Sequence, residues 1–447
     1  MSPLHHAGVV RSRQLEGLRV ECTVPIEVHV ATEHADVGSL ERTVSAALAE
    51  VGIRLWRELV DRLEAALPTP TSCDQCGGRM KSNGRAPRRL VTVSGEVELR
   101  RRRYRCTACG LELVPLDVAL GLEPRTQHTL GVRERGLWLV TEMSYQKAVE
   151  TAAELRRWPI GRGELHRWVA QEGATLDAAR AAETEAILGT HPDRTTQRPR
   201  RGGTVWVSAD GTMVHDRSTG TELEVKIGLV FDGARRIGRT RRTLTGRTLD
   251  AGTESWTVFA ERFTALCTKL GVYEADRICF VSDGAAAIRW IRERAFPSAI
   301  ELLDWYHLAE ALRRAIGDER SDRLEAALDV AAPGDAERLA ELLAGWAYEE
   351  AGLDLDRADK LAAVRGYVLA NRRAIENYAI VPLASSGPME KAVDIVIARR
   401  FKARGMSWFR RGVSALVRLR LLRPNGTWSR YWSARFASAL RPWPSPA

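Results

Sequence analysis

The sequence predicts a multidomain α/β protein in which a small cysteine-bearing module precedes a mixed β-sheet. The chain has 447 residues, and at about 150 residues per domain about three units are expected. Four of the seven cysteines fall in two close pairs. Further along, three consecutive strand-like runs are followed by alternating helix and strand patterns. That order is typical of a mixed sheet with helices on its faces.

The composition favours a polyanionic partner and gives no indication of a membrane protein. The formal net charge is +10 at pH 7, and 45% of the residues are hydrophobic, enough for several buried cores. Most basic residues are Arg, whose guanidinium suits bidentate contact with phosphate, although a basic protein without such a partner has the same charge. No apolar run approaches the roughly 20 residues that span a bilayer, and the first residues lack the apolar core of a secretory signal. We therefore expect a cytoplasmic protein.

The first element expected is an amphipathic helix within an N-terminal region, residues 1–70. Apolar residues recur at three- or four-residue steps across residues 39–67, which is helical spacing. The Pro-containing stretch 68–72 ends the pattern. The apolar face of this helix either packs onto its own domain or pairs two chains, and we expect the first.

A zinc ribbon is predicted for residues 71–122. Two Cys-x-x-Cys motifs, each followed by Gly, supply four thiolates, which form a closed tetrahedral set for a structural zinc ion. A redox-active or metal-free set is the alternative. Four successive arginines, residues 100–103, stand on the strand before the second motif, where they either contact phosphates or form a solvated edge. The expected zinc ligands are Cys73, Cys76, Cys106 and Cys109.

A DNA-binding helix-turn-helix is predicted for residues 123–180. Ala148, Ala152 and Leu155 give one short helix an apolar face, and a Trp-Pro-Ile-Gly turn separates it from a second helix. In this motif the second helix enters the major groove, so Arg162 and Arg167 are expected to contact DNA. A purely structural helical hairpin has the same pattern. Residues 181–203 are polar and basic and are expected to form a linker.

The largest domain is expected to comprise residues 204–317 and 381–425. Residues 318–380, charged and rich in Ala and Leu, are predicted to form a helical insertion that covers the active site or the DNA, and residues 426–447 form a C-terminal tail. Helix is expected to resume at about residue 388. The expected strands are 204–215, 222–233, 236–246, 277–282 and 299–303, and the expected helices are 253–270, 284–295 and 305–316.

Two matched acidic residues follow the apolar runs of predicted strands. Asp210 stands in Ser-Ala-Asp-Gly and Asp283 in Val-Ser-Asp-Gly. If the first and fourth strands of the sheet are neighbours, the two carboxylates lie together, where they repel each other unless a divalent cation separates them. Hard oxygen ligands of this kind suit Mg²⁺. The alternative for Asp283 is that it only caps the following helix.

These segments together resemble the DDE transposases of bacterial insertion sequences, most closely the ISKra/ISLre-type groups, over residues 73–425. Such enzymes have an RNase H-like catalytic core, and their third acidic residue follows a helical insertion in a Gly-x-x-Glu motif. Gly387 and Glu390 match that motif. The basic stretch that follows it matches the family's Gly-Met-x-Trp tail. Asp304 and His307 are similar to an Asp/Cys-x-x-His signature that related transposases carry after the fifth strand.

The resemblance implies a catalytic site with two Mg²⁺ (or Mn²⁺) ions. Asp210 would bridge the ions, Asp283 and Glu390 would each complete one ion's ligands, and Asp304 and His307 would support them. Residues 399–423 contain nine Lys or Arg and no Asp or Glu, which suits contact with a DNA backbone. The DNA-contacting residues expected in this stretch are Arg399, Arg400, Lys402 and Arg404.

By the same resemblance, the chain would be the transposase of a bacterial insertion sequence. It would bind the terminal inverted repeats of its element and target DNA, both double-stranded, and would cut and join strands as a homo-oligomer on DNA, associated with the nucleoid and not with a membrane. One alternative is an inactive or domesticated DNA-binding regulator that keeps the fold. A second is a structure-directed nuclease without strand transfer.

Overall fold

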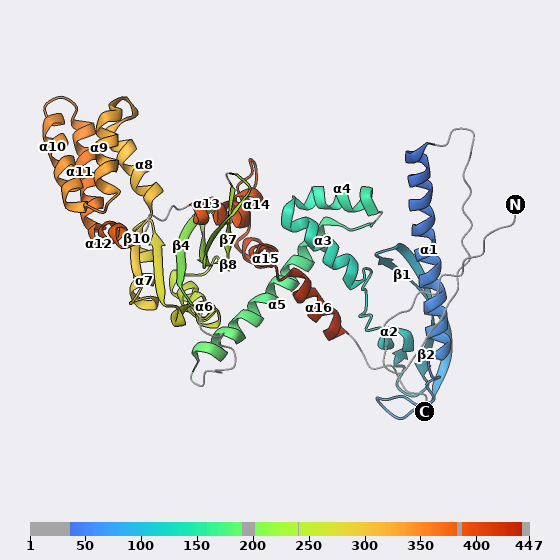
Figure 1. Ribbon diagram of the computed structural model, residues 1–447. Helices are drawn as coiled ribbons and strands as arrows, with labels where there is room; N and C mark the ends of the chain where they lie inside the picture. Colours follow the sequence, from blue (N-terminus) through green and yellow to red (C-terminus); the bar gives the residue numbers. More distant parts are fainter. Residues whose placement is uncertain (1–35, 157, 190–201, 240, 382–386, 440–447) are drawn as a thin grey trace. The chain divides into compact units, whose positions relative to one another are not determined.

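The computed structural model describes residues 36–156, 158–189, 202–239, 241–381 and 387–439 (Figure 1). The chain divides into two compact units, each described below by itself. The first contains the residues up to Trp168 together with those from Ser429 onward, and the second is Val169–Trp428. Among the described helices, none combines the length and the apolar character that crossing a membrane requires.

In the first unit, α1 (Val37–Ala66) confirms the predicted N-terminal helix. The Asp36 side chain caps it by accepting a hydrogen bond from the Ser39 amide. The C-terminal half of α1 buries Val60 against a core from the next two strands, whereas Val44 and Leu48 in its N-terminal half are exposed, so the expected packing holds for one half of the helix. The strands are β1 (Met80–Thr92), β2 (Gly95–Cys106) and β3 (Glu112–Leu113), arranged in that order and antiparallel, followed by α2 (Pro115–Ala119).

The predicted pair of helices forms part of a longer helical segment. Ala148 and Ala152 are buried as expected, but Leu155 is 70% exposed; its assignment to the buried face is wrong. The second helix of the pair continues to Leu188, so it is not short and the linker expected from residue 181 begins later. Residues 190–201 of that linker lie outside the described residues. The helices are α3 (Leu130–Glu142), α4 (Tyr145–Arg156), α5 (Arg162–Leu188) and α16 (Trp428–Ala439).

The second unit contains a five-stranded mixed sheet with the order β10-β9-β4-β5-β8. The central strand β4 pairs antiparallel with β5 and parallel with β9, so the expected neighbourhood of the first and fourth strands is confirmed. The outer pairs are β5 with β8, antiparallel, and β9 with β10, parallel. The strands are β4 (Thr204–His215), β5 (Glu222–Phe231), β8 (Thr248–Gly252), β9 (Arg277–Ser282) and β10 (Ile300–Leu303).

The expected third strand, residues 236–246, is wrong. These residues fall in a separate two-stranded sheet, β6 (Gly233–Ile237) with β7 (Arg241–Thr245), and β8 takes the place beside β5. The physical reason is burial. Leu249 and Ala251 of β8 are buried, whereas Ala234–Ile237 of β6 are exposed, as an arginine-rich hairpin in water should be.

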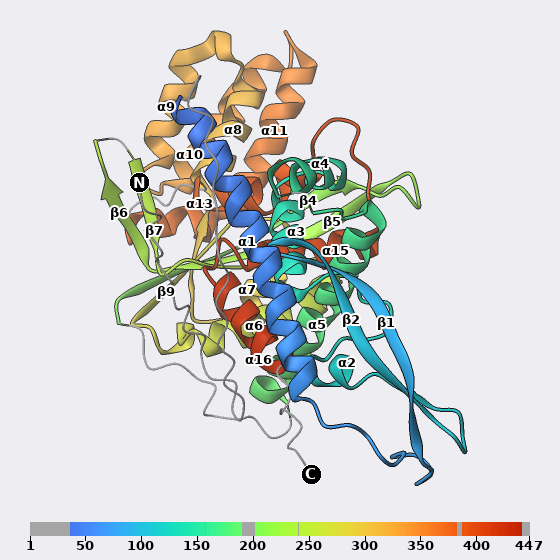
Figure 2. The same ribbon diagram turned by 90° about the vertical axis from the view of Figure 1, so that its right-hand side faces the viewer.

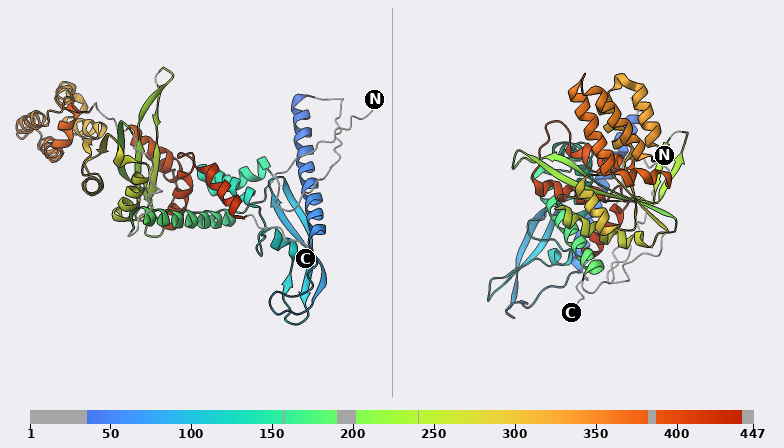
Figure 3. Two further views of the ribbon diagram at one scale, coloured as in Figure 1. Left: turned by 60° about the horizontal axis from the view of Figure 1, so that its bottom comes forward. Right: turned by 90° about the vertical axis from the view of Figure 1, so that its left-hand side faces the viewer.

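Helices cover both faces of the five-stranded sheet. Phe259 of α6 and Ile288 of α7 lie in one core with Val207, whereas Leu308 of α8 lies in a second core with Val281 and the insertion. The predicted insertion is helical, and its helices lie together beside α8 (Figures 2 and 3). The helices are α6 (Trp256–Lys269), α7 (Ala286–Ala295), α8 (Trp305–Ile316), α9 (Ser321–Ala331), α10 (Ala336–Glu350), α11 (Leu355–Ala370) and α12 (Arg372–Glu376), with short 3₁₀ turns η2 (Val272–Glu274), η3 (Asp318–Arg320) and η4 (Asn377–Ala379).

The chain returns from the insertion to the sheet through a broken helical segment. Its first helix, α13, packs against β4 and β5. The basic stretch that follows is not one continuous helix, because the Gly-containing turn 402–409 interrupts it. The elements are α13 (Gly387–Val393), the π-helical turn η5 (Asp394–Ala398), α14 (Arg399–Phe401) and α15 (Arg410–Leu421).

Candidate functional site

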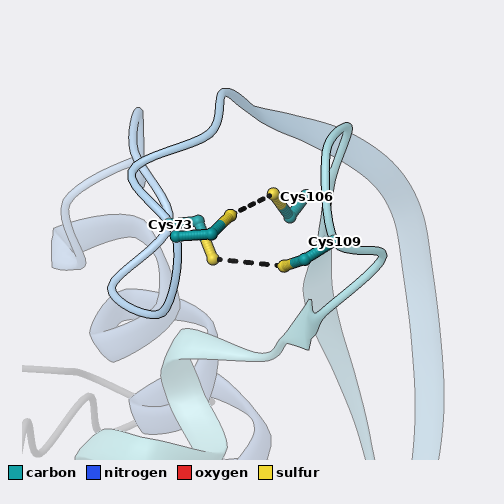
Figure 4. Close-up of side chains that lie close together, drawn as sticks. Cys73, Cys106 and Cys109 are labelled. Atoms are coloured by element: carbon teal, nitrogen blue, oxygen red, sulfur yellow. Dashed lines mark hydrogen bonds between the residues drawn. The ribbon is translucent and has the colours of Figure 1, made fainter.

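The four predicted zinc ligands lie together in the first unit. The Sγ atoms of all four cysteines are within 4.8 Å of one another. The labelled side chains of Cys73, Cys106 and Cys109 point toward one another from two turns (Figure 4). Cys73 Sγ is 3.7 Å from Cys109 Sγ, and Cys76 Sγ is 3.5 Å from Cys106 Sγ. Sulfurs about 2.3 Å from a tetrahedral zinc ion lie about 3.8 Å apart, so this geometry fits the metal.

The two turns favour thiolate at this cluster. The backbone amides of Cys109 and Ala108 lower the pKa of Cys106 to about 6. At Cys76 the Gly78 amide acts in the same direction, but the neighbouring thiols Cys109 and Cys106 raise the pKa to about 12, because two metal-free sulfurs this close share a proton. Both turns contain a glycine in the left-handed region, at φ +71° and +76°, which a side chain would disfavour.

The arginines of the ribbon serve more than one role. Arg101 is buried against Asp117, and Arg102 donates to Glu64 of α1. Arg100 is exposed and lies 3.6 Å from Glu98. The run of four arginines therefore fastens α1 and α2 to the hairpin and leaves only part of its charge for an external partner.

In the second unit, the sheet brings Asp210 and Asp283 to the same region. Ser208 of β4 is opposite Val281 of β9 in a parallel pair, and the Ser208 hydroxyl donates to the Val281 carbonyl at 2.8 Å. Asp210 stands two residues after Ser208, and Asp283 stands two residues after Val281. Both side chains are half-buried.

Burial and neighbouring carboxylates destabilise the charged form of Asp210. Desolvation raises its pKa to about 6, and the charges of Asp283 and Asp304 act in the same direction; the Gly211 amide and His307 oppose them. A carboxyl group with this environment is a good ligand for a cation, because a bound positive charge removes the repulsion.

The capping interpretation of Asp283 is only partly correct. Its Oδ1 accepts a hydrogen bond from the Ala285 amide at 2.8 Å, which stabilises the turn between β9 and α7. The N-cap residue of α7 is however Ala285, without a side-chain cap. Asp283 therefore shapes the turn and leaves its second carboxylate oxygen for another partner.

Asp304 and His307 form a supporting pair beside these residues. Asp304 is buried and caps α8, accepting from the amides of Tyr306 at 2.8 Å and His307 at 3.3 Å. Its Oδ2 lies 3.4 Å from His307 Nδ1. Contact with Asp304 raises the pKa of His307, burial opposes this, and Asp283 and Asp210 add to the increase. All four side chains thus interact electrostatically.

The third predicted carboxylate is not gathered with the other two. Glu390 is exposed in the first turn of α13. Across the described part of the chain, the cysteine cluster is the one place where three or more possible metal ligands come within 4.8 Å of one another. The three carboxylates therefore do not form a group within that distance, and Glu390 lies on α13, which packs against β4 and β5.

The side chains expected to contact DNA from the second helix of the pair are exposed. Arg162 is at the start of α5, and Arg167 bonds to Glu164 at 2.5 Å. Between them, His166 stacks on Tyr145 of α4 with ring centroids 3.6 Å apart. This helix start presents basic groups to solvent, which is what groove contact needs.

The basic stretch 399–423 requires a correction. Arg400 is 1% exposed and lies over the Trp408 ring, with Cζ 4.7 Å from its centroid, so in this structure it cannot contact DNA. Arg418 and Arg420 are also buried, bonded to α5 and to carbonyls of η5, respectively. Counting charge overestimated the exposed basic surface, because three of these arginines are internal. The three other predicted contacts, Arg399, Lys402 and Arg404, are exposed.

Two features escaped the sequence prediction. The β6–β7 hairpin carries exposed Arg235, Arg236 and Arg242, with Arg236 directly opposite Arg242; the run of arginines could have indicated this. Tyr367 of the insertion bonds to the backbone of Asp283, and no local pattern could have indicated a contact between residues so far apart.

Comparison with known proteins places the chain in a family. The model of an uncharacterised protein family, UPF0236, matches residues 30–435. The chain belongs to the UPF0236 family. It is 25% identical over 367 residues to a "UPF0236 protein in vanSb 3'region" of Streptococcus gallolyticus, a match that covers 77% of this chain and 74% of that relative. The UPF0236 match includes the positions of both ligand sets described above.

Proposed function

We propose that this UPF0236 protein is a DDE-type transposase that cuts and joins DNA with divalent metal ions. The observation that carries the proposal is the meeting of Asp210 and Asp283 where β4 and β9 run parallel. The sheet, with antiparallel β5 and β8 on one side of β4 and parallel β9 and β10 on the other, agrees with the RNase H-like core that the resemblance implies.

The residues fit the metal in part. Asp210 and Asp283 supply hard oxygen ligands, and the raised pKa of Asp210 is relieved when a cation binds. Glu390 is the third ligand that the resemblance implies, and α13 packs against the two strands β4 and β5. Glu390 would complete the ligand set when DNA and metal are present.

The chain's own residues then have distinct tasks. Two Mg²⁺ ions, when bound, supply activation of the attacking water or 3′-hydroxyl and stabilisation of the leaving 3′-oxygen. Asp210 and Asp283 would hold the ions. Asp304 fixes the start of α8, and the positive form of His307 lowers the repulsion among the carboxylates. No covalent intermediate between protein and DNA is needed.

Other parts of the chain provide the DNA contacts in this proposal. The ribbon, with Zn²⁺ on its four cysteines, and α5 with Arg162 and Arg167 read the terminal inverted repeats. Lys402, Arg399 and Arg404 hold the backbone near the site, where the Lys402 amine already bonds to Thr212 of β4 at 2.5 Å. Synapsis of two element ends requires a homo-oligomer on double-stranded DNA, and such an enzyme works at the bacterial nucleoid.

The test is cleavage of a DNA fragment that carries the ends of the source element, with Mg²⁺ or Mn²⁺, by the wild type and by Asp283→Asn at matched zinc content. We expect metal-dependent cleavage by the wild type, and loss of cleavage with DNA binding retained in the variant. An end-binding, folded wild type that never cuts overturns the proposal.

A second candidate is a DNA-binding regulator that keeps the fold without cutting. The observation that favours it is the position of Glu390, which is exposed and not gathered with the aspartates. The two candidates separate in the experiment above, because the regulator binds the same ends but shows no metal-dependent product.

A further inference from the structure

We propose that the helical insertion positions the Asp283 turn, with Tyr367 as the positioning residue. This inference rests on the proposed function. The Tyr367 hydroxyl, on α11, donates a hydrogen bond to the main-chain carbonyl of Asp283 at 2.7 Å. Because the contact is to the carbonyl, the Asp283 carboxylate stays available. The insertion thus reaches the backbone from which a proposed metal ligand projects.

A second contact holds the next residue of the turn. Asn371, buried just after α11, accepts a hydrogen bond from Arg289 of α7 at 3.0 Å, and the same guanidinium group donates to the Gly284 carbonyl at 3.2 Å. The Asn371 amide donates to the Tyr367 carbonyl at 2.9 Å. Tyr367, Asn371 and Arg289 therefore form a connected chain of hydrogen bonds along the Asp283 turn.

The turn itself is built to fit against the insertion. Gly284 has φ +82°, and a Cβ at this position would lie 2.5 Å from the Asn371 side-chain oxygen. The backbone must therefore take a left-handed conformation and pass close to the insertion, both of which glycine permits. Inside the turn, the Ala285 amide bonds to the Asp283 carboxylate, so moving the backbone moves the carboxylate.

The insertion holds the neighbouring strand end by the same kind of bond. The Tyr378 hydroxyl donates to the Leu303 carbonyl at 2.6 Å, and the Asn377 amide donates to the Glu301 carbonyl at 2.8 Å. Both acceptors are on β10, ahead of Asp304. The residues that end the insertion thus fix two strand ends, and Tyr378 offers a matched control because its phenol contacts β10 and not the Asp283 turn.

The experiment compares Tyr367→Phe with Tyr378→Phe in the full-length, zinc-loaded protein. Each change removes one hydroxyl and one hydrogen bond to a strand-end carbonyl. We expect Tyr367→Phe to raise the Mn²⁺ concentration for half-maximal cleavage about fivefold, the size of one hydrogen bond, with unchanged DNA affinity. We expect Tyr378→Phe to lower thermal stability and to leave the Mn²⁺ requirement at the wild-type value.

A readout independent of cleavage is Mn²⁺ binding, followed by electron paramagnetic resonance, together with amide hydrogen exchange of the peptide containing Gly284 and Ala285. We expect weaker Mn²⁺ binding and faster exchange in Tyr367→Phe only. Equal loss of stability in both variants with a wild-type Mn²⁺ requirement overturns the positioning role and leaves the transposase proposal intact. A wild type that binds Mn²⁺ but does not cut overturns the proposed function, and the binding and exchange data still decide the positioning role.

Discussion

The two ligand sets of this protein are assembled in opposite ways. The cysteines come from two turns beside one β-hairpin, and their sulfurs are gathered within 4.8 Å of one another. The carboxylates come from three distant stretches, Asp210 on β4, Asp283 after β9 and Glu390 on α13; the charge of Asp283 acts on Asp210, and Glu390 is exposed. A local set is closed by the folding of its own hairpin, whereas a distributed set depends on tertiary packing and on its ligand.

The difference has an energetic cause. Backbone amides of the turns favour thiolate at Cys106, and a zinc ion would neutralise the charge gathered there. Carboxylates at neutral pH repel one another, and partial burial increases the cost. The third carboxylate, Glu390, is exposed, and a cation at the aspartates would compensate the charge that it adds. We infer a preformed structural site in one unit and an active site completed on binding in the other.

The largest effect is expected from removing the zinc ion that we propose at the cysteine cluster. Structural zinc contributes on the order of 10 kcal/mol to the folding of small zinc domains, so Cys106→Ser should unfold the ribbon. Limited proteolysis at residues 71–113 and zinc content measure this. Cys267→Ser, the same change at a buried cysteine of the second unit, serves as control and should leave the ribbon protected. A ribbon that stays protected without zinc would contradict the structural role.

Asp210→Asn is expected to abolish cleavage without unfolding the protein. A metal ion held at the reacting phosphate supplies several kcal/mol, so the rate should fall about a thousandfold or more. Rates of single-turnover cleavage at saturating Mn²⁺ measure the change, and Asp359→Asn, an exposed carboxylate of α11, is the control. If Asp210→Asn unfolds the second unit as Cys106→Ser unfolds the ribbon, the contrast between the two sites is lost.

Glu390→Gln is expected to have a smaller effect, about a hundredfold on the cleavage rate, because one ion retains both aspartates. The change should not alter the stability of the metal-free protein, since Glu390 is exposed there. In the wild type, Mn²⁺ with DNA should slow hydrogen exchange in α13. Exchange that does not respond to metal and DNA, together with full activity of Glu390→Gln, would remove Glu390 from the site.

Much of this architecture could be predicted from local patterns. The apolar runs of β4 and β9 each end at a small residue that is followed by Asp. This pattern predicted two buried, neighbouring strands with their carboxylates close to each other. The pairing of Ser208 with Val281 confirms that the strands are neighbours. The spacing of the cysteines sufficed for their cluster, because all four lie on one hairpin and its turns.

The remaining features depend on long-range contacts that no local pattern contains. The short strand β8 has Asp250 in its middle, a residue that argues against a strand until Arg180 and Arg262 neutralise it from α5 and α6. Likewise, the sequence distinguishes neither the buried Arg400 from the exposed Arg399 nor Tyr367 from any other helical tyrosine. Their roles are set by partners that only the tertiary structure brings near.

The smallest expected effect is a dependence of the free energy of unfolding on pH. This dependence should arise at the carboxylate site and not at the cysteine cluster. In the metal-free protein, burial and the charge of Asp283 raise the pKa of Asp210 from 3.8 to about 6. The folded state then binds more protons than the unfolded state between these values, so the free energy of unfolding falls as the pH rises from about 4 to about 6. At 1.36 kcal/mol per pKa unit, the loss is no more than about 3 kcal/mol.

Asp210→Asn should remove this loss, so the variant should exceed the wild type in stability above pH 6 and approach it near pH 4. Urea-dependent hydrogen exchange of peptides from β4 and β9, in Mg²⁺-free buffer with zinc retained, measures the difference. Adding Mn²⁺ at pH 7 should stabilise the wild type and not the variant, because the cation compensates the charge of the Asp210 carboxylate. An equal pH slope in both proteins would mean that the Asp210 carboxylate carries no electrostatic cost, and the argument that a cation must complete this site would fail.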